Sequence, residues 1–172
     1  WEYVVESNES GVKEFDFRKT KWGFSIEEVK STETGTLIPE LNKPNMLGFT
    51  GTVGGLETLI GYYFVNNKLW KAAYIFSETH SNRNLFIEDY GIIKNILIEK
   101  YGEPINDNIN WSNDLYSDDP SQFGFAVSLG YLSLNCGWQI GDTIIQMVLD
   151  GDNYKISHIL SYTNETLKNL AA

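Results

Sequence analysis

This 172-residue sequence holds two histidines and one cysteine, and although it has many carboxylates, none of them is tied to a predicted pocket. His80 and His158 are far apart, and neither belongs to an HxH or HExxH motif, so no metal site is predicted from them. Cys136 could attack as a thiolate if His158 activated it, since both alternate onto the apolar face of predicted strands. The same alternation favours structural roles, with Cys136 as a small buried hydrophobic side chain and His158 as a core or edge histidine.

The glycine-rich and acidic segments do not complete a phosphate or calcium motif. Residues 51–55 (GTVGG) lack the Gly-Lys-Ser/Thr ending of a phosphate-binding loop. Residues 150–153 (DGDN) match only a fragment of a calcium loop, and Asp118 and Asp119 precede a proline in a polar segment. We expect turns and loops at these positions, with weak calcium binding at the aspartate pair as the alternative. We predict no catalytic residue, no metal and no cofactor.

The net charge of −10, from 13 basic and 23 acidic residues, argues against nucleic acid and anionic lipid as partners. Nucleic acid binding needs a concentrated basic surface, and docking on anionic lipid headgroups also needs basic residues. No stretch approaches 18 consecutive apolar residues, so no transmembrane segment is predicted. The partners that remain are a protein or a small ligand.

The first third of the chain carries a strong helix-start signal in KWGFSIEEVK (21–30). Ser25 is a good N-cap, and Glu28 three residues later completes a capping box, which predicts a helix over 26–33. We interpret the preceding Trp22 as architectural, because a large aromatic side chain before a helix can pack the incoming chain onto a sheet.

A longer helix is predicted over 85–101, where apolar residues recur at spacings of three and four along one face. Asn84 can cap its start, and Gly102 can end it in a left-handed conformation. A short third helix is expected at 164–171.

Alternating apolar residues predict strands on both sides of the long helix. We expect strands at 1–6 and 46–53, followed by a hairpin over 56–78. A polar loop is predicted at 106–121, and strands then continue to about residue 163.

Gly-Asp turns at 141–142 and 151–152 would place the apolar side chains of the last three strands on one face, as in an antiparallel meander. The order of elements indicates an α+β fold, an antiparallel sheet with helices packed on one face. We expect a single domain over 1–172, in which 15–78 and 84–163 look like two loosely repeated helix-plus-strands units.

The turn of the 56–78 hairpin is predicted at Asn66 and Asn67, since Asn tolerates the positive φ of a type I′ turn. This turn pairs Phe64 with Leu69. If the side chains of both strands alternate regularly from that pair, both faces of the hairpin are apolar. This is unusual for a sheet that has one solvent-exposed face.

One of these faces carries Tyr63, Trp70 and Tyr74, which would line an open, concave sheet. Aromatic anchors on a rigid sheet suit protein or ligand recognition, so we predict that these three residues bind a partner. The alternative is burial of this face under the N-terminal strand, the 36–45 connection or a dimer partner.

Four features occur in an order that resembles a known group of proteins: KWGFSIEEVK, YYFVNNKLWKAAYIF, IEKYGEP and the following Trp111. The order is similar to that in small exported bacterial proteins and lipoproteins with a β-lactamase-inhibitory-protein-like fold, including the SmpA/OmlA-like outer-membrane assembly lipoproteins. In those families a helical layer packs on an antiparallel sheet. The resemblance covers most of 15–163 and implies a non-enzymatic, exported binding or scaffold protein.

The chain starts at Trp1 with no initiator Met, as a processed or shortened product would. Together with the resemblance, this predicts an extracytoplasmic protein, either secreted or a membrane-anchored lipoprotein. A lipid anchor would lie upstream of residue 1.

We therefore expect a non-enzymatic binding or interaction module. The alternative is a small-ligand carrier in which helix 85–101 grips a closed cavity of roughly 300–1,000 Å³. A third hypothesis is a hydrolase with a cleft near the Asp-rich loop, which would require convergent titratable groups with shifted pKa values.

Overall fold

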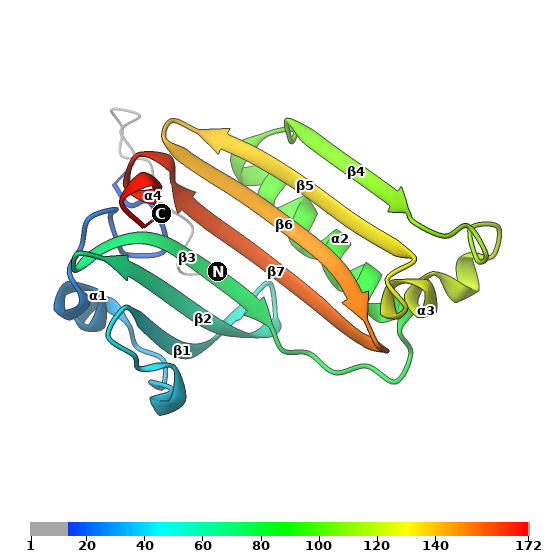
Figure 1. Cartoon of the computed structure of the whole chain (residues 1–172), viewed down its shortest axis with the longest axis horizontal. Coiled ribbons are helices and arrows are strands. Elements are labelled where there is room, and N and C mark those ends of the chain that lie inside the picture. The colour runs from blue at the N-terminus through cyan, green and yellow to red at the C-terminus, as the bar shows by residue number, and fades with distance from the viewer. Residues whose placement is uncertain (1–13, 172) are drawn as a thin grey trace.

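Seven antiparallel strands form one sheet in the computed structural model, which describes residues 14–171 (Figure 1). Across the sheet the strands follow the order β1-β2-β3-β7-β6-β5-β4, so the early and late strands meet where β3 pairs with β7. The strands are β1 (Met46–Val53), β2 (Leu56–Val65), β3 (Lys68–Phe76), β4 (Asn106–Trp111), β5 (Leu132–Ile140), β6 (Thr143–Asp152) and β7 (Lys155–Asn164). The strand expected at 1–6 lies outside the described residues.

Four α-helices accompany the sheet within residues 14–171. They are α1 (Ile26–Thr32), α2 (Asn84–Tyr101), α3 (Phe123–Ser128) and α4 (Glu165–Ala171), with two 3₁₀ turns, η1 (Pro39–Leu41) and η2 (Pro120–Gln122). In Figure 1, α2 passes behind β5, β6 and β7, and α3 contacts the same three strands. α4 lies against β2, β3 and β7. The arrangement confirms the predicted α+β class.

The core lies between α2 and the sheet, as the spacing of apolar residues predicted. Tyr90, Ile93 and Leu97 are buried on one face of α2. Met147 of β6 and Leu160 of β7 are paired neighbours and are also buried. Full burial of an aliphatic side chain of this size contributes roughly 1.5–3 kcal/mol, so apolar contact is the main force that holds α2 on the sheet.

The capping box at the start of α1 is confirmed. Ser25 Oγ accepts a hydrogen bond from Glu28 N, and Glu28 Oε1 accepts one from Ser25 N, each at 3.2 Å. These bonds satisfy two backbone N–H groups that the first turn of a helix would otherwise leave without a partner. The helix therefore begins where the sequence predicted.

Trp22 makes the contacts expected of an architectural residue. It is half-buried against the core, and its Nε1 donates a hydrogen bond to Thr143 Oγ1 at 2.8 Å. The next residue, Gly23, has a φ of 91° and donates its N–H to Leu69 O at 2.8 Å. Because a side chain at this φ would be strained, glycine allows the turn that attaches the incoming chain to β3 and β6.

The start of α2 differs from the prediction, because Asn84 is the first helical residue and does not cap the helix. Its Oδ1 instead accepts a hydrogen bond from Gly124 N at 2.7 Å, and its Nδ2 donates to Ser121 O at 3.2 Å. Asn84 therefore joins the beginnings of α2 and α3. At the other end, Gly102 terminates the helix as predicted, but its φ of 84° and ψ of −167° differ from the left-handed helical conformation that was expected.

Two further elements were missed in the segment predicted as a polar loop followed by strands. β4 occupies Asn106–Trp111, and α3 occupies Phe123–Ser128. β4 is an edge strand whose first five residues are exposed, so it lacks the apolar alternation that identifies a half-buried strand. α3 has only six residues, too few to show a helical period.

The last hairpin turns two residues later than predicted, at Asn153 and Tyr154, whose φ values are 49° and 68°. Gly151 lies within β6 instead. A Cβ added at Gly151 would sit 2.2 Å from Val127 O, so glycine at this position allows the backbone of α3 to approach the sheet. We interpreted Gly151 as part of a turn, but glycine is needed there because α3 packs closely on β6.

Candidate functional site

A β-bulge divides the aromatic residues of the β2–β3 hairpin between the two faces of the sheet. The predicted turn is confirmed by φ values of 50° and 55° at its two asparagines, and Phe64 pairs with Leu69 as expected. The next pair, however, is Tyr63 with Lys71, which leaves Trp70 as an extra residue in β3. Beyond this bulge, the side chains of β3 lie on the opposite face of the sheet from the one that strict alternation after Leu69 would give.

The bulge separates Tyr74 from the other two predicted site residues. Tyr74 is only 9% exposed and packs against Phe17, so the prediction that it shares an open face with Tyr63 and Trp70 is wrong. Tyr63 and Trp70 are both half-buried. Their binding role stays a prediction.

Tyr63 and Trp70 line the same pocket, which is open to solvent and has a volume of about 520 Å³. We call it the hairpin pocket. Its lining comprises Asn45, Tyr63, Phe64, Val65, Asn66, Asn67, Trp70, Leu170 and Ala171. None of these described residues carries a charged side chain. The pocket therefore offers aromatic rings and neutral amides between the tip of the hairpin and α4.

Tyr63 lies flat along the strand because the residue two positions earlier is glycine. A Cβ added at Gly61 would sit 3.3 Å from both Cε2 and the hydroxyl oxygen of Tyr63. The cross-strand neighbour Lys71 places its Nζ 5.4 Å from the ring centroid. Burial raises the pKa of the Tyr63 hydroxyl.

Trp70 differs from two tryptophans that pack against the core. Trp22 Nε1 donates to Thr143 Oγ1, and Trp138 Nε1 donates to Gly102 O, each at 2.8 Å. Within residues 14–171, nothing accepts a hydrogen bond from Trp70 Nε1. A buried indole N–H generally finds a partner within the protein. Trp70 is only half-buried, so its N–H is available to solvent or a ligand.

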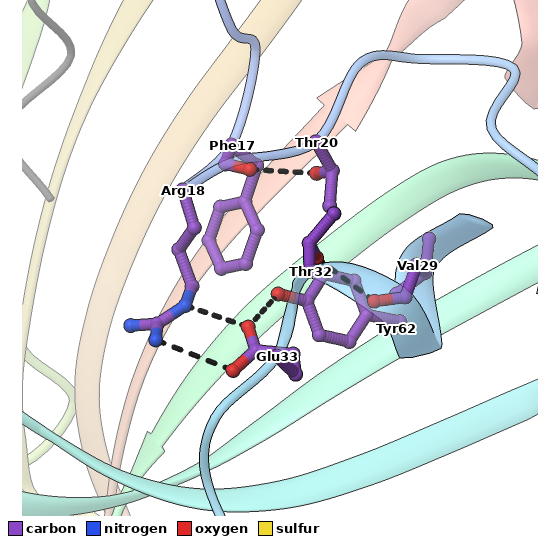
Figure 2. Close-up of polar contacts among 7 residues, drawn as sticks. All are labelled: Phe17, Arg18, Thr20, Val29, Thr32, Glu33 and Tyr62. Carbon is purple, nitrogen blue, oxygen red and sulfur yellow. Dashed lines mark hydrogen bonds and ion pairs between the residues drawn. The ribbon is translucent and has the colours of Figure 1, made fainter.

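On the sheet face that carries α2, a buried ion pair joins the N-terminal segment to the end of α1, and Tyr62 connects it to β2 (Figure 2). Arg18 Nε donates to Glu33 Oε1 at 2.8 Å, and the Tyr62 hydroxyl donates to the same oxygen. The Arg18 and Glu33 side chains are only 9% and 2% exposed. Burial opposes the charge of Arg18, but Tyr74, Glu33 and Tyr62 together raise the pKa of the guanidinium. These groups satisfy one another within the chain, which is typical of a structural network.

A cavity beside this network is lined by α2 but is small. Arg18, Tyr74, Leu97 and Tyr162 are among its lining residues, and its volume is about 100 Å³. The predicted small-ligand carrier required roughly 300–1,000 Å³ at this place. The space under α2 is therefore smaller than that hypothesis needs.

The two histidines, which sequence reasoning treated separately, line adjoining pockets of about 320 and 290 Å³ at the end of β3. His80 Nε2 lies 2.6 Å from Asp89 Oδ2, and its ring packs edge-on against Phe86. His158 is stacked on Phe76, and burial lowers the pKa of its imidazole to about 4. No sequence motif links a loop histidine with a helical aspartate nine residues later, so this pair was missed.

The proposed Cys136–His158 dyad is not supported by the geometry. Met147 of β6 pairs with Cys136 of β5, and His158 Nε2 lies 3.2 Å from Met147 Sδ. Burial also raises the pKa of the Cys136 thiol, which disfavours the thiolate. Both residues occupy the core positions that the strand pattern indicated.

Asp119, one of the two aspartates weighed as a calcium site, makes hydrogen bonds within its own loop. Asp119 Oδ1 accepts hydrogen bonds from the backbone N–H and the hydroxyl of Ser121 at the start of η2. Across residues 14–171, no group of three or more His, Cys, Asp and Glu side chains is placed to hold a metal ion. The described helices are also too short or too polar to cross a membrane.

No protein-family model matches this chain, and neither does any curated protein or solved structure compared with it. The structure is that of an α+β protein with a seven-stranded antiparallel sheet, and no family or homologue is identified for it. The function has to be argued from the hairpin pocket and the residues around it.

Proposed function

We propose that this chain is a non-enzymatic binding module and that the hairpin pocket is its recognition site. The observation that carries the proposal is the pair of half-buried aromatic side chains, Tyr63 and Trp70, which share an open pocket of about 520 Å³. Binding sites concentrate aromatic side chains in such concave surfaces because they offer large contact area with little loss of conformational entropy.

The surroundings of the buried Glu33 favour a structural role over a catalytic one. Glu33 is held by Arg18 and Tyr62. A general base needs a lone pair directed at substrate, whereas this carboxylate is already engaged inside the chain.

The resemblance to exported proteins of the β-lactamase-inhibitory-protein-like group suggests where this module works. We propose an extracytoplasmic location, secreted or anchored through a lipid upstream of residue 1. Detection of the protein in the envelope or culture medium of the source organism, and its absence from the cytoplasmic fraction, is the expected result.

The proposal is tested by capture from envelope and culture-medium fractions with three immobilised proteins: the wild type, Trp70→Ala and Tyr154→Ala. Tyr154 is the matched control, because it is an aromatic residue that is 60% exposed at a distant turn. We expect a partner that the wild type and Tyr154→Ala retain and that Trp70→Ala loses. Equal capture by all three proteins would show that the hairpin pocket is not the site.

A further inference from the structure

We infer that the hairpin pocket binds a carbohydrate, meaning a neutral ligand with many hydroxyl groups and apolar C–H ring faces. The inference rests on the proposed function and names its ligand class. It combines three properties of the pocket: a lining without charge, aromatic surfaces held by the sheet, and amide groups at the rim.

The lining without charge is notable because the whole chain has a net charge of −10. None of the described lining residues is Asp, Glu, Lys or Arg. Lys71 does not line the pocket, but its Nζ lies over the Tyr63 ring, 5.4 Å from the centroid, so a positive charge stands beside the pocket. A cation that enters a partly desolvated site without a negative partner loses hydration and gains little in return. A neutral ligand avoids that cost.

The aromatic surface is held in a fixed orientation. Gly61 leaves room for the Tyr63 ring to lie along β2, and Trp70 projects from the bulge of β3 beside it. The C–H groups on one face of a sugar ring carry a slight positive charge, and the face of an aromatic ring is negative. Stacking of the two surfaces buries apolar area while the sugar hydroxyl groups at the ring edge stay free for hydrogen bonds.

Asparagine amides stand where those hydroxyl groups would lie. Asn45, Asn66 and Asn67 are exposed at the rim, and each amide offers both donors and an acceptor. Asn67 Oδ1 accepts a hydrogen bond from Ile26 N at 3.1 Å, which fixes the side chain while its NH₂ group keeps its donors. Trp70 Nε1 adds another donor. Hydroxyl groups both donate and accept, so they complement this set better than an anion or a cation does.

The probes are neutral oligosaccharides of glucose, xylose and N-acetylglucosamine, with oligogalacturonate as a charged oligosaccharide of the same ring size. Binding is measured by isothermal titration calorimetry and by the change in tryptophan fluorescence. We expect at least one neutral series to bind, with oligogalacturonate at least about tenfold weaker. Trp70→Ala should weaken binding about tenfold or more, and Tyr154→Ala should leave it unchanged.

Asn67→Asp is the conservative variant, because it keeps the oxygen that accepts from Ile26 N but removes the amide donors and adds a charge. It should remain folded by circular dichroism and bind the neutral probe at least about fivefold more weakly. Absence of binding by every neutral oligosaccharide at millimolar concentration overturns the inference, as does binding that Trp70→Ala leaves intact.

Different results would contradict the carbohydrate assignment and the binding module. If no saccharide binds but a protein is captured in a Trp70-dependent manner, the carbohydrate assignment is wrong and the binding module stands. If Trp70→Ala changes neither saccharide binding nor capture, both are wrong.

Discussion

Tyr62 and Tyr63 are consecutive residues of β2, yet they meet opposite surroundings. Tyr62 is buried on the helix-covered face, where its hydroxyl donates to Glu33 and its ring packs edge-on against Phe17 at 5.5 Å. Tyr63 is half-buried on the other face, where its ring lies across Gly61 and lines the hairpin pocket. The Tyr62 hydroxyl thus finds its acceptor within the chain, whereas Tyr63 lies at a pocket that is open to solvent.

The difference predicts two kinds of mutational effect. On the inner face, removal of one member of a network leaves a buried partner without its hydrogen bond or counter-charge, which lowers the free energy of unfolding. On the outer face, the same removal exposes a group to water, so stability changes little and binding changes most. The following tests proceed from the largest expected change in stability to the smallest.

The largest change is expected for Glu33→Gln. This substitution removes the counter-charge of the buried Arg18, and breaking a buried ion pair on one side costs about 3–5 kcal/mol. Urea denaturation followed by circular dichroism measures the loss. The control is Glu27→Gln, because Glu27 is 83% exposed and its pair with Lys30 should contribute less than about 1 kcal/mol. Equal effects for the two variants would mean that the inner network does not stabilise the fold.

The second test uses pH. Burial lowers the pKa of His158 from 6.5 to about 4. Between these two pH values, the imidazole is protonated in the unfolded chain but neutral in the folded chain. The stability contributed by His158 is therefore present above pH 6.5 and is lost as the pH falls toward 4, by about 3 kcal/mol in total.

Free energies of unfolding at pH 7 and pH 4.5 measure this loss in the wild type and in His158→Gln. The variant should show a smaller difference between the two pH values, because glutamine does not titrate. His80→Gln is the control for the other histidine. If His158→Gln keeps the full pH dependence of the wild type, the buried imidazole is not its source.

The third test compares the neighbouring tyrosines directly. Tyr62→Phe removes a hydrogen bond to the buried Glu33 carboxylate, and bonds to charged groups contribute roughly 1.5–3 kcal/mol. Tyr63→Phe removes a hydroxyl group from the outer face and should change stability by less than about 0.5 kcal/mol. Similar losses from the two substitutions, measured by urea denaturation, would contradict the division between the faces.

The sequence predicted the turn of the β2–β3 hairpin, but it did not predict which side chains of the hairpin lie on each face. The two asparagines specified a type I′ turn, and the pairing of Phe64 with Leu69 followed from it. The bulge at Trp70 did not follow, because an extra residue in one strand depends on how the sheet twists and packs rather than on local pattern. One unpredicted residue was enough to move Tyr74 from the expected binding face into the core.

The inner network was also beyond local sequence reasoning. Arg18 and Glu33 are 15 residues apart and belong to no motif. Periodicity identifies apolar faces because they repeat along one element, whereas a buried ion pair forms between elements that only the fold brings together. The capping box of α1 was predictable for the opposite reason, since all of its partners lie within one turn of helix.

The sharpest separation of fold from binding, with little change in stability, is expected for Gly61→Ala. The new Cβ would sit 3.3 Å from the Tyr63 ring, so the ring must shift by a few tenths of an ångström. Alanine also reduces the entropy of the unfolded chain, by about 0.4–1 kcal/mol where the backbone tolerates it, which offsets the cost of that shift. Gly91→Ala is the control, because a Cβ at Gly91 meets nothing within 4 Å on α2. Both variants should unfold within about 1 kcal/mol of the wild type, but only Gly61→Ala should weaken binding of the neutral oligosaccharide. Unchanged affinity in Gly61→Ala, measured by the same calorimetric titration, would show that the position of the Tyr63 ring does not matter for recognition.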